Sequence, residues 1–128
     1  SELSKLAHLE RLTLYRNNIG GTIPPQLGEL RKLSTLNLAR NNIIGTIPQE
    51  LFDATNLEEL HLFGNSITGT MPTAIGNLTS LQKLWLNDND IEGAIPDNLY
   101  NLEQLYSLRI DNNHLHGSIS TLRGNLTL

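Results

Sequence analysis

The chain has 128 residues, of which 17% are charged, with a formal net charge of −4 and no cysteine. Its Lys and Arg residues are scattered among acidic ones, so the composition favours neither nucleic acid nor an anionic membrane surface as a partner. The lack of cysteine excludes disulfides and thiolate metal sites. No stretch approaches the roughly 18 consecutive apolar residues of a membrane-spanning helix, and we expect no membrane contact by this segment.

A phrase of 24 residues repeats along the whole chain. It reads L-x-x-L-x-L-x-x-N-x-I-x-G-x-I-P from Leu9 onward and predicts a single solenoid domain over residues 1–128. Residues 1–8 match the end of an earlier repeat, because Leu3 and Leu6 occupy the positions of Leu27 and Leu30. We therefore expect the domain to be part of a longer chain. The repeats span 9–32, 33–56, 57–80, 81–104 and 105–128.

Each repeat opens with a Leu-x-Leu alternation, whose period of two is typical of a strand with one buried face. Stacking these strands predicts a parallel sheet with the leucines inside and the intervening side chains outside. The expected strands are centred on the alternations at 12–14, 36–38, 60–62, 84–86 and 108–110.

Three further columns of the repeat predict the return path of the chain. An Asn column, beginning at Asn17, is expected to satisfy backbone groups where the chain leaves each strand. A Gly column, beginning at Gly21, indicates turns with positive φ or close approach to the next rung. The Ile-Pro step, first seen at Pro24, suits the start of a short helical turn on the far side.

The last repeat departs from the pattern. Ser120 stands where Pro is expected, Arg123 stands where Leu is expected, and Leu122 falls one residue early. We expect the regular structure to loosen after Ile119.

The repeated phrase resembles the plant-type leucine-rich repeat of receptor-kinase ectodomains, receptor-like proteins and polygalacturonase-inhibiting proteins. The resemblance covers nearly the whole chain and implies an α/β solenoid: a right-handed superhelix with a concave parallel sheet and with short strands and helical turns on the convex side. It also implies a non-catalytic module that binds a protein or peptide, in receptor or defence signalling, and it favours an extracellular or secretory-pathway location. The cysteine-bearing caps usual in secreted members are missing from this sequence.

The outward positions of the strands are the candidate ligand-binding surface, because the scaffold does not dictate them. Three of the six aromatic residues of the chain fall there, and aromatic residues dominate interface hot spots. Ala39 and Gly64 suggest a shallow pocket beside Phe63. Arginines lie toward the first repeats and aspartates toward the last, a polarity that would orient a partner. The predicted binding residues are Tyr15, Arg40, His61, Phe63, Trp85, Asp88, Arg109 and Asp111.

Several alternatives stay open beside this interpretation. One is a structural scaffold or assembly subunit that docks through its convex side or its unpaired strand edges. A row of small hydroxyl residues at Thr22, Thr46, Thr70 and Ser118, broken by Ala94, resembles the Thr arrays of ice-binding solenoids, although Thr beside Gly explains it equally well.

Catalysis and cofactor binding find little support in the sequence. His114 and His116 lie near Asp111, but His116 falls beside the Gly column, away from the strand, so we predict no metal site. No nucleophile–base arrangement or phosphate-binding loop occurs, and we predict neither an enzyme nor a cofactor.

Two Asn-x-Thr sequons begin at Asn77 and Asn125. Each would be a glycan acceptor in a secreted protein.

Overall fold

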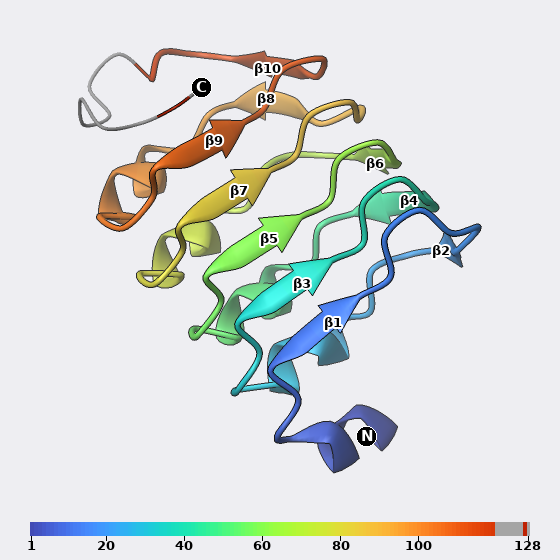
Figure 1. The fold of residues 1–128 in the computed structure, drawn as a ribbon. Helices are drawn as coiled ribbons and strands as arrows, with labels where there is room; N and C mark the ends of the chain where they lie inside the picture. Colours follow the sequence, from blue (N-terminus) through green and yellow to red (C-terminus); the bar gives the residue numbers. More distant parts are fainter. Residues whose placement is uncertain (120–126, 128) are drawn as a thin grey trace.

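The computed structural model describes residues 1–119 and 127 and shows a coil of stacked rungs, one for each repeat (Figure 1). We number the rungs one to five from the repeat that begins at Leu9. Each rung contributes one strand to a concave sheet and one short strand to a second sheet. A 3₁₀ helix closes each of the first four rungs, and η1 precedes the first. This confirms the predicted solenoid.

The concave sheet is parallel, with its strands in chain order. Arg11 pairs with Thr35, Thr35 with Glu59, Glu59 with Lys83 and Lys83 with Ser107, so the register repeats every 24 residues. Each strand begins one residue before the predicted alternation. The strands are β1 (Arg11–Thr13), β3 (Thr35–Asn37), β5 (Glu59–His61), β7 (Lys83–Trp85) and β9 (Ser107–Arg109).

The second sheet runs along the flank of the coil and is also parallel (Figure 1). Its first three strands form one ladder, its last two form another, and a single bridge from Thr70 to Glu92 joins them. The short strand that the family resemblance implied near each Gly-x-Ile-Pro segment is therefore present. The strands are β2 (Gly20–Gly21), β4 (Asn42–Thr46), β6 (Ser66–Thr68), β8 (Glu92–Ala94) and β10 (His114–His116).

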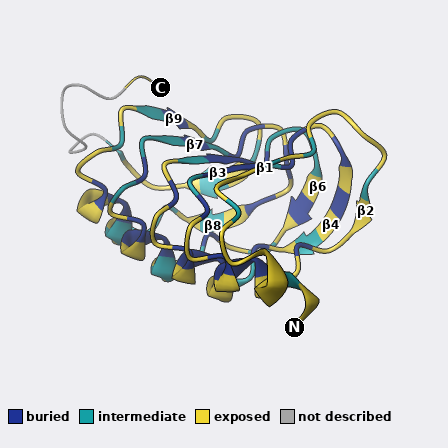
Figure 2. Ribbon diagram, turned by 60° about the horizontal axis from the view of Figure 1, so that its bottom comes forward, coloured by how far each residue is buried: buried dark blue, intermediate teal, exposed yellow. Residues whose placement is uncertain are grey.

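Helical turns occupy the far side, as the Ile-Pro step predicts. Four of them follow a proline in an extended conformation, which cannot donate a backbone hydrogen bond and so precedes a helix at no cost. Their outer surfaces are exposed (Figure 2). The turns are η1 (Glu2–Leu6), η2 (Pro25–Glu29), η3 (Gln49–Asp53), η4 (Thr73–Asn77) and η5 (Asp97–Asn101).

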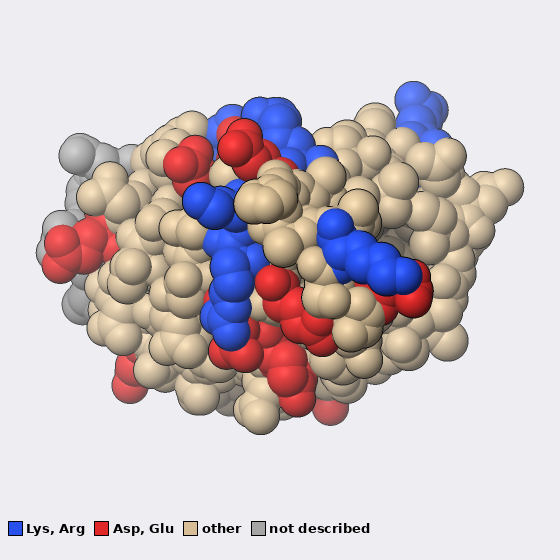
Figure 3. All heavy atoms as spheres, turned by 90° about the horizontal axis from the view of Figure 1, so that it is seen from below, with Lys and Arg blue, Asp and Glu red and all other residues tan. Residues whose placement is uncertain are grey.

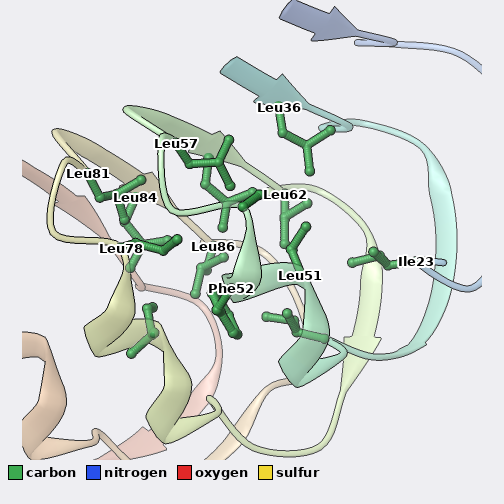
Figure 4. Close-up of a cluster of buried hydrophobic side chains, with 14 of the residues drawn as sticks. Ile23, Leu36, Leu51, Phe52, Leu57, Leu62, Leu78, Leu81, Leu84 and Leu86 are labelled. Atoms are coloured by element: carbon green, nitrogen blue, oxygen red, sulfur yellow. The ribbon is translucent and has the colours of Figure 1, made fainter. Parts of the chain in front are cut away.

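The core is a stack of aliphatic layers between the concave sheet and the helical turns (Figure 4). Leu36, Leu60 and Leu84 point inward from successive strands and are 0% exposed. Phe52, on η3, is the largest fully buried side chain. Because each rung buries the same columns against its neighbours, the core is continuous along the coil.

The Asn column forms the predicted hydrogen-bonded spine. Asn89 is typical: its Oδ1 accepts from the backbone N–H of Ile67 at 3.0 Å, and its Nδ2 donates to the carbonyls of Leu62 and Leu86 at 3.1 and 3.0 Å. Each amide therefore joins its own rung to the preceding one. Asn41, Asn65 and Asn113 make equivalent bonds.

The Gly column meets both requirements predicted for it. Gly69 has φ of +77°, and a Cβ there would lie 2.7 Å from Cγ2 of Thr46 on the preceding rung. Gly45 stands in the same relation to Thr22. The Thr row and the Gly column therefore pack against one another from rung to rung.

The 24-residue period ends at the last rung. Thr127 pairs with Ser107, so the chain returns to the concave sheet after 20 residues (127 − 107). The departures predicted at Ser120, Leu122 and Arg123 and the sequon at Asn125 lie outside the described residues.

Candidate binding face

The concave face is built from the side chains that alternate with the buried leucines. Four residues at these outward positions, where the alternation predicts exposure, are at most 8% exposed: Thr35, Ala39, His61 and Asn87. The reason is lateral packing: strands of a sheet lie about 4.8 Å apart, so a large side chain covers a smaller neighbour on the next rung. The concave face is consequently a packed surface with its own buried layer.

An aromatic strip runs across this face through three predicted residues, Tyr15, Phe63 and Trp85. The ring centroids of Tyr15 and Phe63 are 6.2 Å apart, and those of Phe63 and Trp85 are 6.0 Å apart. These are contact distances for aromatic pairs. The structure therefore brings together, on rungs one, three and four, the residues that the sequence singled out.

The pocket predicted beside Phe63 is filled. Ala39 lies on the rung between Tyr15 and Phe63 and is 0% exposed, because the two larger rings meet over its methyl group. Gly64 gives no hollow either, since a Cβ built there would lie 3.2 Å from Cγ of Arg40. The small residues allow the strip to close into a continuous surface.

His61 lies beneath the edge of this strip. Its ring meets Trp85 edge-on at a centroid distance of 4.5 Å, and its Nε2 lies 3.1 Å from Oε2 of Glu59. Burial lowers the pKa of His61 below its usual value, although Glu59 opposes the shift. Near neutral pH the ring is therefore neutral, and the geometry fits Nε2–H donating to the Glu59 carboxylate.

Glu59 links His61 to Lys83, whose Nζ lies 3.1 Å from the other carboxylate oxygen. Burial alone would raise the pKa of Glu59, but the hydrogen bonds from Lys83 and His61 outweigh it, and this pKa lies below its usual value. The hydrogen bond to Glu59 raises the pKa of Lys83. The network fixes the charges of one edge of the face across rungs three and four.

Two predicted arginines lie over the strip. The guanidinium carbon of Arg109 is 5.0 Å from the Trp85 ring centroid, and that of Arg40 is 6.0 Å from the Phe63 centroid. Both distances fit cation–π contacts. Trp85 is held further by its Nε1–H, which donates to Oγ of Ser107 at 2.9 Å.

The strands end in a column of left-handed backbone that the repeat pattern did not predict. Arg16, Arg40, Asp88 and Asn112 have φ between 52° and 60°, and Gly64 has φ of 67°. The identities of Gly64, Asp88 and Asn112 carried the available signal, because Gly, Asn and Asp are enriched in this conformation. Arg40 and Asp88 therefore lie in the turns that follow β3 and β7.

The last two predicted residues, Asp88 and Asp111, lie at the opposite end of the face from Arg16 and Arg40. Asp88 is on rung four and Asp111 on rung five, and both are exposed. Asp88 is held by two amide groups: Asn87 Nδ2 donates to Oδ2 at 2.7 Å, and Asn112 Nδ2 donates to Oδ1 at 2.6 Å.

Among the described residues, no group of three or more His, Asp or Glu side chains could hold a metal ion. His114 is on the second sheet, where its Nε2 lies 3.8 Å from Oδ1 of Asp90. Asp111 lies two residues after β9 of the concave sheet.

The charged residues do not gather into a region of one sign on the face shown in Figure 3, where acidic and basic side chains lie side by side. No helix in the described part of the chain is long and apolar enough to cross a membrane.

Comparison with protein families gives a match to the leucine-rich repeat region over residues 1–123. Comparison with curated proteins gives no match.

Solved structures include several close matches. The ectodomain of the Arabidopsis thaliana membrane receptor kinase GASSHO1/SCHENGEN3, in complex with CASPARIAN STRIP INTEGRITY FACTOR 2, is 40% identical with a TM-score of 0.89, over 92% of this chain and 14% of that one. The plant peptide hormone receptor RGFR1 in complex with RGF2 is 30% identical with a TM-score of 0.83, over 97% of this chain and 24% of that one.

A plant ice-binding protein is 28% identical with a TM-score of 0.78, over 90% of this chain and 44% of that one. The chain thus spans 14–44% of the length of these three structures. The repeats, the Asn spine and these matches show that the chain belongs to the leucine-rich-repeat family, in the plant type found in receptor-kinase ectodomains.

Proposed function

We propose that this chain is the ligand-recognising segment of a receptor-like protein and that it binds a peptide across its concave face. The observation that carries the proposal is the aromatic strip: Phe63 contacts both Tyr15 and Trp85 on a surface that the solenoid does not require to be aromatic. Large, ordered aromatic groups are the usual anchors of protein interfaces.

The comparisons support a peptide as the ligand. Two of the similar proteins were solved with the partners that their names give, CASPARIAN STRIP INTEGRITY FACTOR 2 and RGF2, and RGFR1 is a peptide hormone receptor. A strip that crosses several rungs suits an extended peptide better than a compact small molecule, because successive residues of the peptide would meet successive rungs.

The test uses a phage-displayed library of random peptides, selected on the purified chain. The Phe63→Ala/Trp85→Ala double variant should weaken binding of the selected peptides by more than about tenfold, the effect of removing one or two hot-spot residues. Tyr100→Ala, an exposed aromatic residue on η5, is the matched control and should change affinity by less than about twofold.

Equal affinity of wild type and double variant, with both folded by circular dichroism, would refute the concave site. A selection that yields no binder would count against peptide recognition altogether.

Docking as a scaffold is the second candidate function, and one observation favours it. The core is open beside β1, where a cavity of about 350 Å³ is lined almost entirely by apolar side chains, among them Leu6, Leu12 and Ile23. A partner that covers this end would bury those side chains. Protection of the amides of β1, rather than β5 and β7, from hydrogen exchange in a native assembly would favour this function.

Ice binding has two supporting observations. Thr22, Thr46 and Thr70 form an exposed row along the second sheet, and the chain is similar to a plant ice-binding protein. Asp90 and Glu92 interrupt the uncharged surface on the fourth rung. Thermal hysteresis of the purified chain is the direct measurement, and we expect none, because Thr–Gly packing accounts for the row.

The sequon at Asn77 lies on the helical side, where Asn77 and Thr79 are exposed and Leu78 between them is buried. A glycan there would leave the concave face free. Mass spectrometry of the protein secreted from a eukaryotic host should find Asn77 occupied, and an unmodified Asn77 would contradict this assignment.

A further inference from the structure

Trp85, the central anchor of the proposed site, is held by residues on both sides of its strand. β5 and β9 flank β7 in the concave sheet (Figure 1). From β5 the ring of His61 meets the indole edge-on at a centroid distance of 4.5 Å, and from β9 the Oγ of Ser107 accepts the indole Nε1–H at 2.9 Å. Both contacts restrict rotation of the ring about its side-chain torsions. The ring is therefore ordered before any ligand arrives.

His61 is too deeply buried to serve as a ligand contact itself. It is 6% exposed, and the register places it between Asn37 of β3 and Trp85 of β7. Any contribution that His61 makes to ligand binding is therefore made through the ring of Trp85.

The orientation of the imidazole is fixed in turn by a network of charged groups. Its Nε2 lies 3.1 Å from one carboxylate oxygen of Glu59, and the other carboxylate oxygen lies 3.1 Å from Nζ of Lys83. Because Nε2 is hydrogen-bonded, the imidazole cannot turn about its last side-chain torsion without breaking that bond. A continuous series of contacts therefore runs from Lys83 through Glu59 and His61 to the ring of Trp85.

We infer that His61 and Ser107 are positioning residues, which hold the Trp85 ring in the orientation that a peptide ligand meets. This inference rests on the proposed peptide-binding function and adds to it the residues that set the affinity of its central anchor. A ligand that meets an ordered ring avoids the entropy cost of ordering it. For one large side chain that cost corresponds to about two- to tenfold in affinity.

Protonation of His61 should release the ring. The charged groups that face His61 are Glu59 on its own strand and Lys83 on β7, whereas β3 presents the uncharged Asn37. Burial lowers the pKa of His61, Lys83 adds to the lowering, and Glu59 opposes both. The buried position thus disfavours the charged ring. Peptide affinity should be constant above pH 6.5 and should fall as the pH drops toward the lowered pKa.

The test uses one peptide that is selected from the random library on the wild-type chain and contains no His. His61→Ala and Ser107→Ala should each weaken its binding about two- to tenfold at neutral pH. His61→Phe places an aromatic ring beside Trp85 again, so it should recover most of the affinity. Because Phe does not titrate, this variant should also lose the fall in affinity on acidification.

Two control variants remove the same chemical groups at places away from Trp85. His114→Ala removes a histidine that lies 3.8 Å from a carboxylate on the second sheet. Ser34→Ala removes a hydroxyl that donates to the carbonyl of Glu10. Each should change peptide affinity by less than about twofold and leave its pH profile unchanged.

The order of the ring is measured directly by fluorine NMR of chain that carries fluorotryptophan, because Trp85 is the only Trp. The wild type should give one narrow signal. His61→Ala and Ser107→Ala should broaden or split it under conditions where circular dichroism shows both variants folded. His61→Phe should restore the narrow signal.

The two proposals fail in different ways. If a peptide that needs Phe63 and Trp85 binds His61→Ala and Ser107→Ala as tightly as wild type, the positioning role is overturned and peptide binding stands. Weaker binding with an unchanged fluorine signal would also overturn the positioning role, because the ring would then be ordered without these two residues. A peptide that binds Phe63→Ala/Trp85→Ala as tightly as wild type would overturn the proposed function, whatever the fluorine signal shows.

Discussion

The concave sheet and the second sheet have the same rung spacing and the same parallel pairing, yet their surfaces differ. On the second sheet the row of Thr22, Thr46 and Thr70 is regular, and its methyl groups pack against the Gly column. On the concave sheet the corresponding rows mix Tyr, Ala, Phe, Asn and Asp. The regular row is therefore explained by packing, whereas the irregular rows hold residues that packing does not require. Function is best sought where the scaffold leaves the choice open.

The largest expected effect is a difference in unfolding free energy between two phenylalanine substitutions, one in the core and one on the concave face. Phe52→Ala should cost about 3–5 kcal/mol of unfolding free energy, because it opens a cavity in the core. Phe63→Ala should cost about 1 kcal/mol, because its ring is only partly buried. Urea unfolding followed by circular dichroism measures both. A loss at Phe63 as large as that at Phe52 would mean that the aromatic strip is structural.

The second-largest expected effect on unfolding free energy concerns the hydrogen-bonded Asn column. Asn89→Ala leaves the backbone N–H of Ile67 unpaired and removes one hydrogen bond from each of the Leu62 and Leu86 carbonyls, which keep the amides of Asn65 and Asn113. The cost should be roughly 3 kcal/mol, from about 1–3 kcal/mol for the unpaired N–H and about 0.5–1.5 kcal/mol for each of the other two bonds. Asn18→Ala, at an exposed position, is the matched control and should stay within about 0.5 kcal/mol of wild type. Similar unfolding midpoints for the two variants would contradict the assigned role of the column.

The third effect tests whether the Thr row is explained by packing. Gly69→Ala should cost about 1–3 kcal/mol, because φ is +77° and the new Cβ meets Thr46. Thr46→Ala in the same chain should recover part of that cost, since it removes the clashing methyl group.

Gly20→Ala is the control for this pair, because Gly20 does not have positive φ and its nearest contact to a new Cβ is 3.8 Å. If the Gly69 and Thr46 substitutions were additive, the row would need another explanation and the ice-binding candidate would gain weight.

The smallest effect is a pH dependence confined to the concave face. The pKa of His61 is lowered by burial, so the unfolded chain binds a proton more readily than the folded one. The stability from this residue is complete above the unfolded value, near pH 6.5, and is lost as the pH falls toward the lowered folded pKa. Urea midpoints of wild type and His61→Gln should converge over that range.

Trp85 gives a second measurement of the same titration. It is the only Trp in the chain, and its ring contacts His61 at 4.5 Å. Its fluorescence should change with a midpoint below pH 6.5, and His61→Gln should abolish the change. A midpoint above pH 6.5 would show that Glu59 outweighs burial.

Much of the fold was predictable because each constraint recurs four or five times along the chain. The strands, the spine, the Gly turns and the proline-led helical turns all fall where the columns place them. The predictions that failed concern single positions: His61 and Asn87 were expected to be exposed, and a pocket was expected beside Phe63. A strand's alternation shows which side a residue faces, but not how tall its neighbours on the adjacent rungs are.

The sequence by itself determined the solenoid, because its leucines, asparagines, glycines and prolines act through local geometry and through contacts that recur at a fixed spacing. Only the tertiary structure decided how the variable side chains meet: that Tyr15 and Phe63 close over Ala39, that His61 is buried against Trp85, and that Asn112 donates to Asp88. Those outcomes depend on side-chain size and orientation across rungs 24 residues or more apart, which no local pattern encodes.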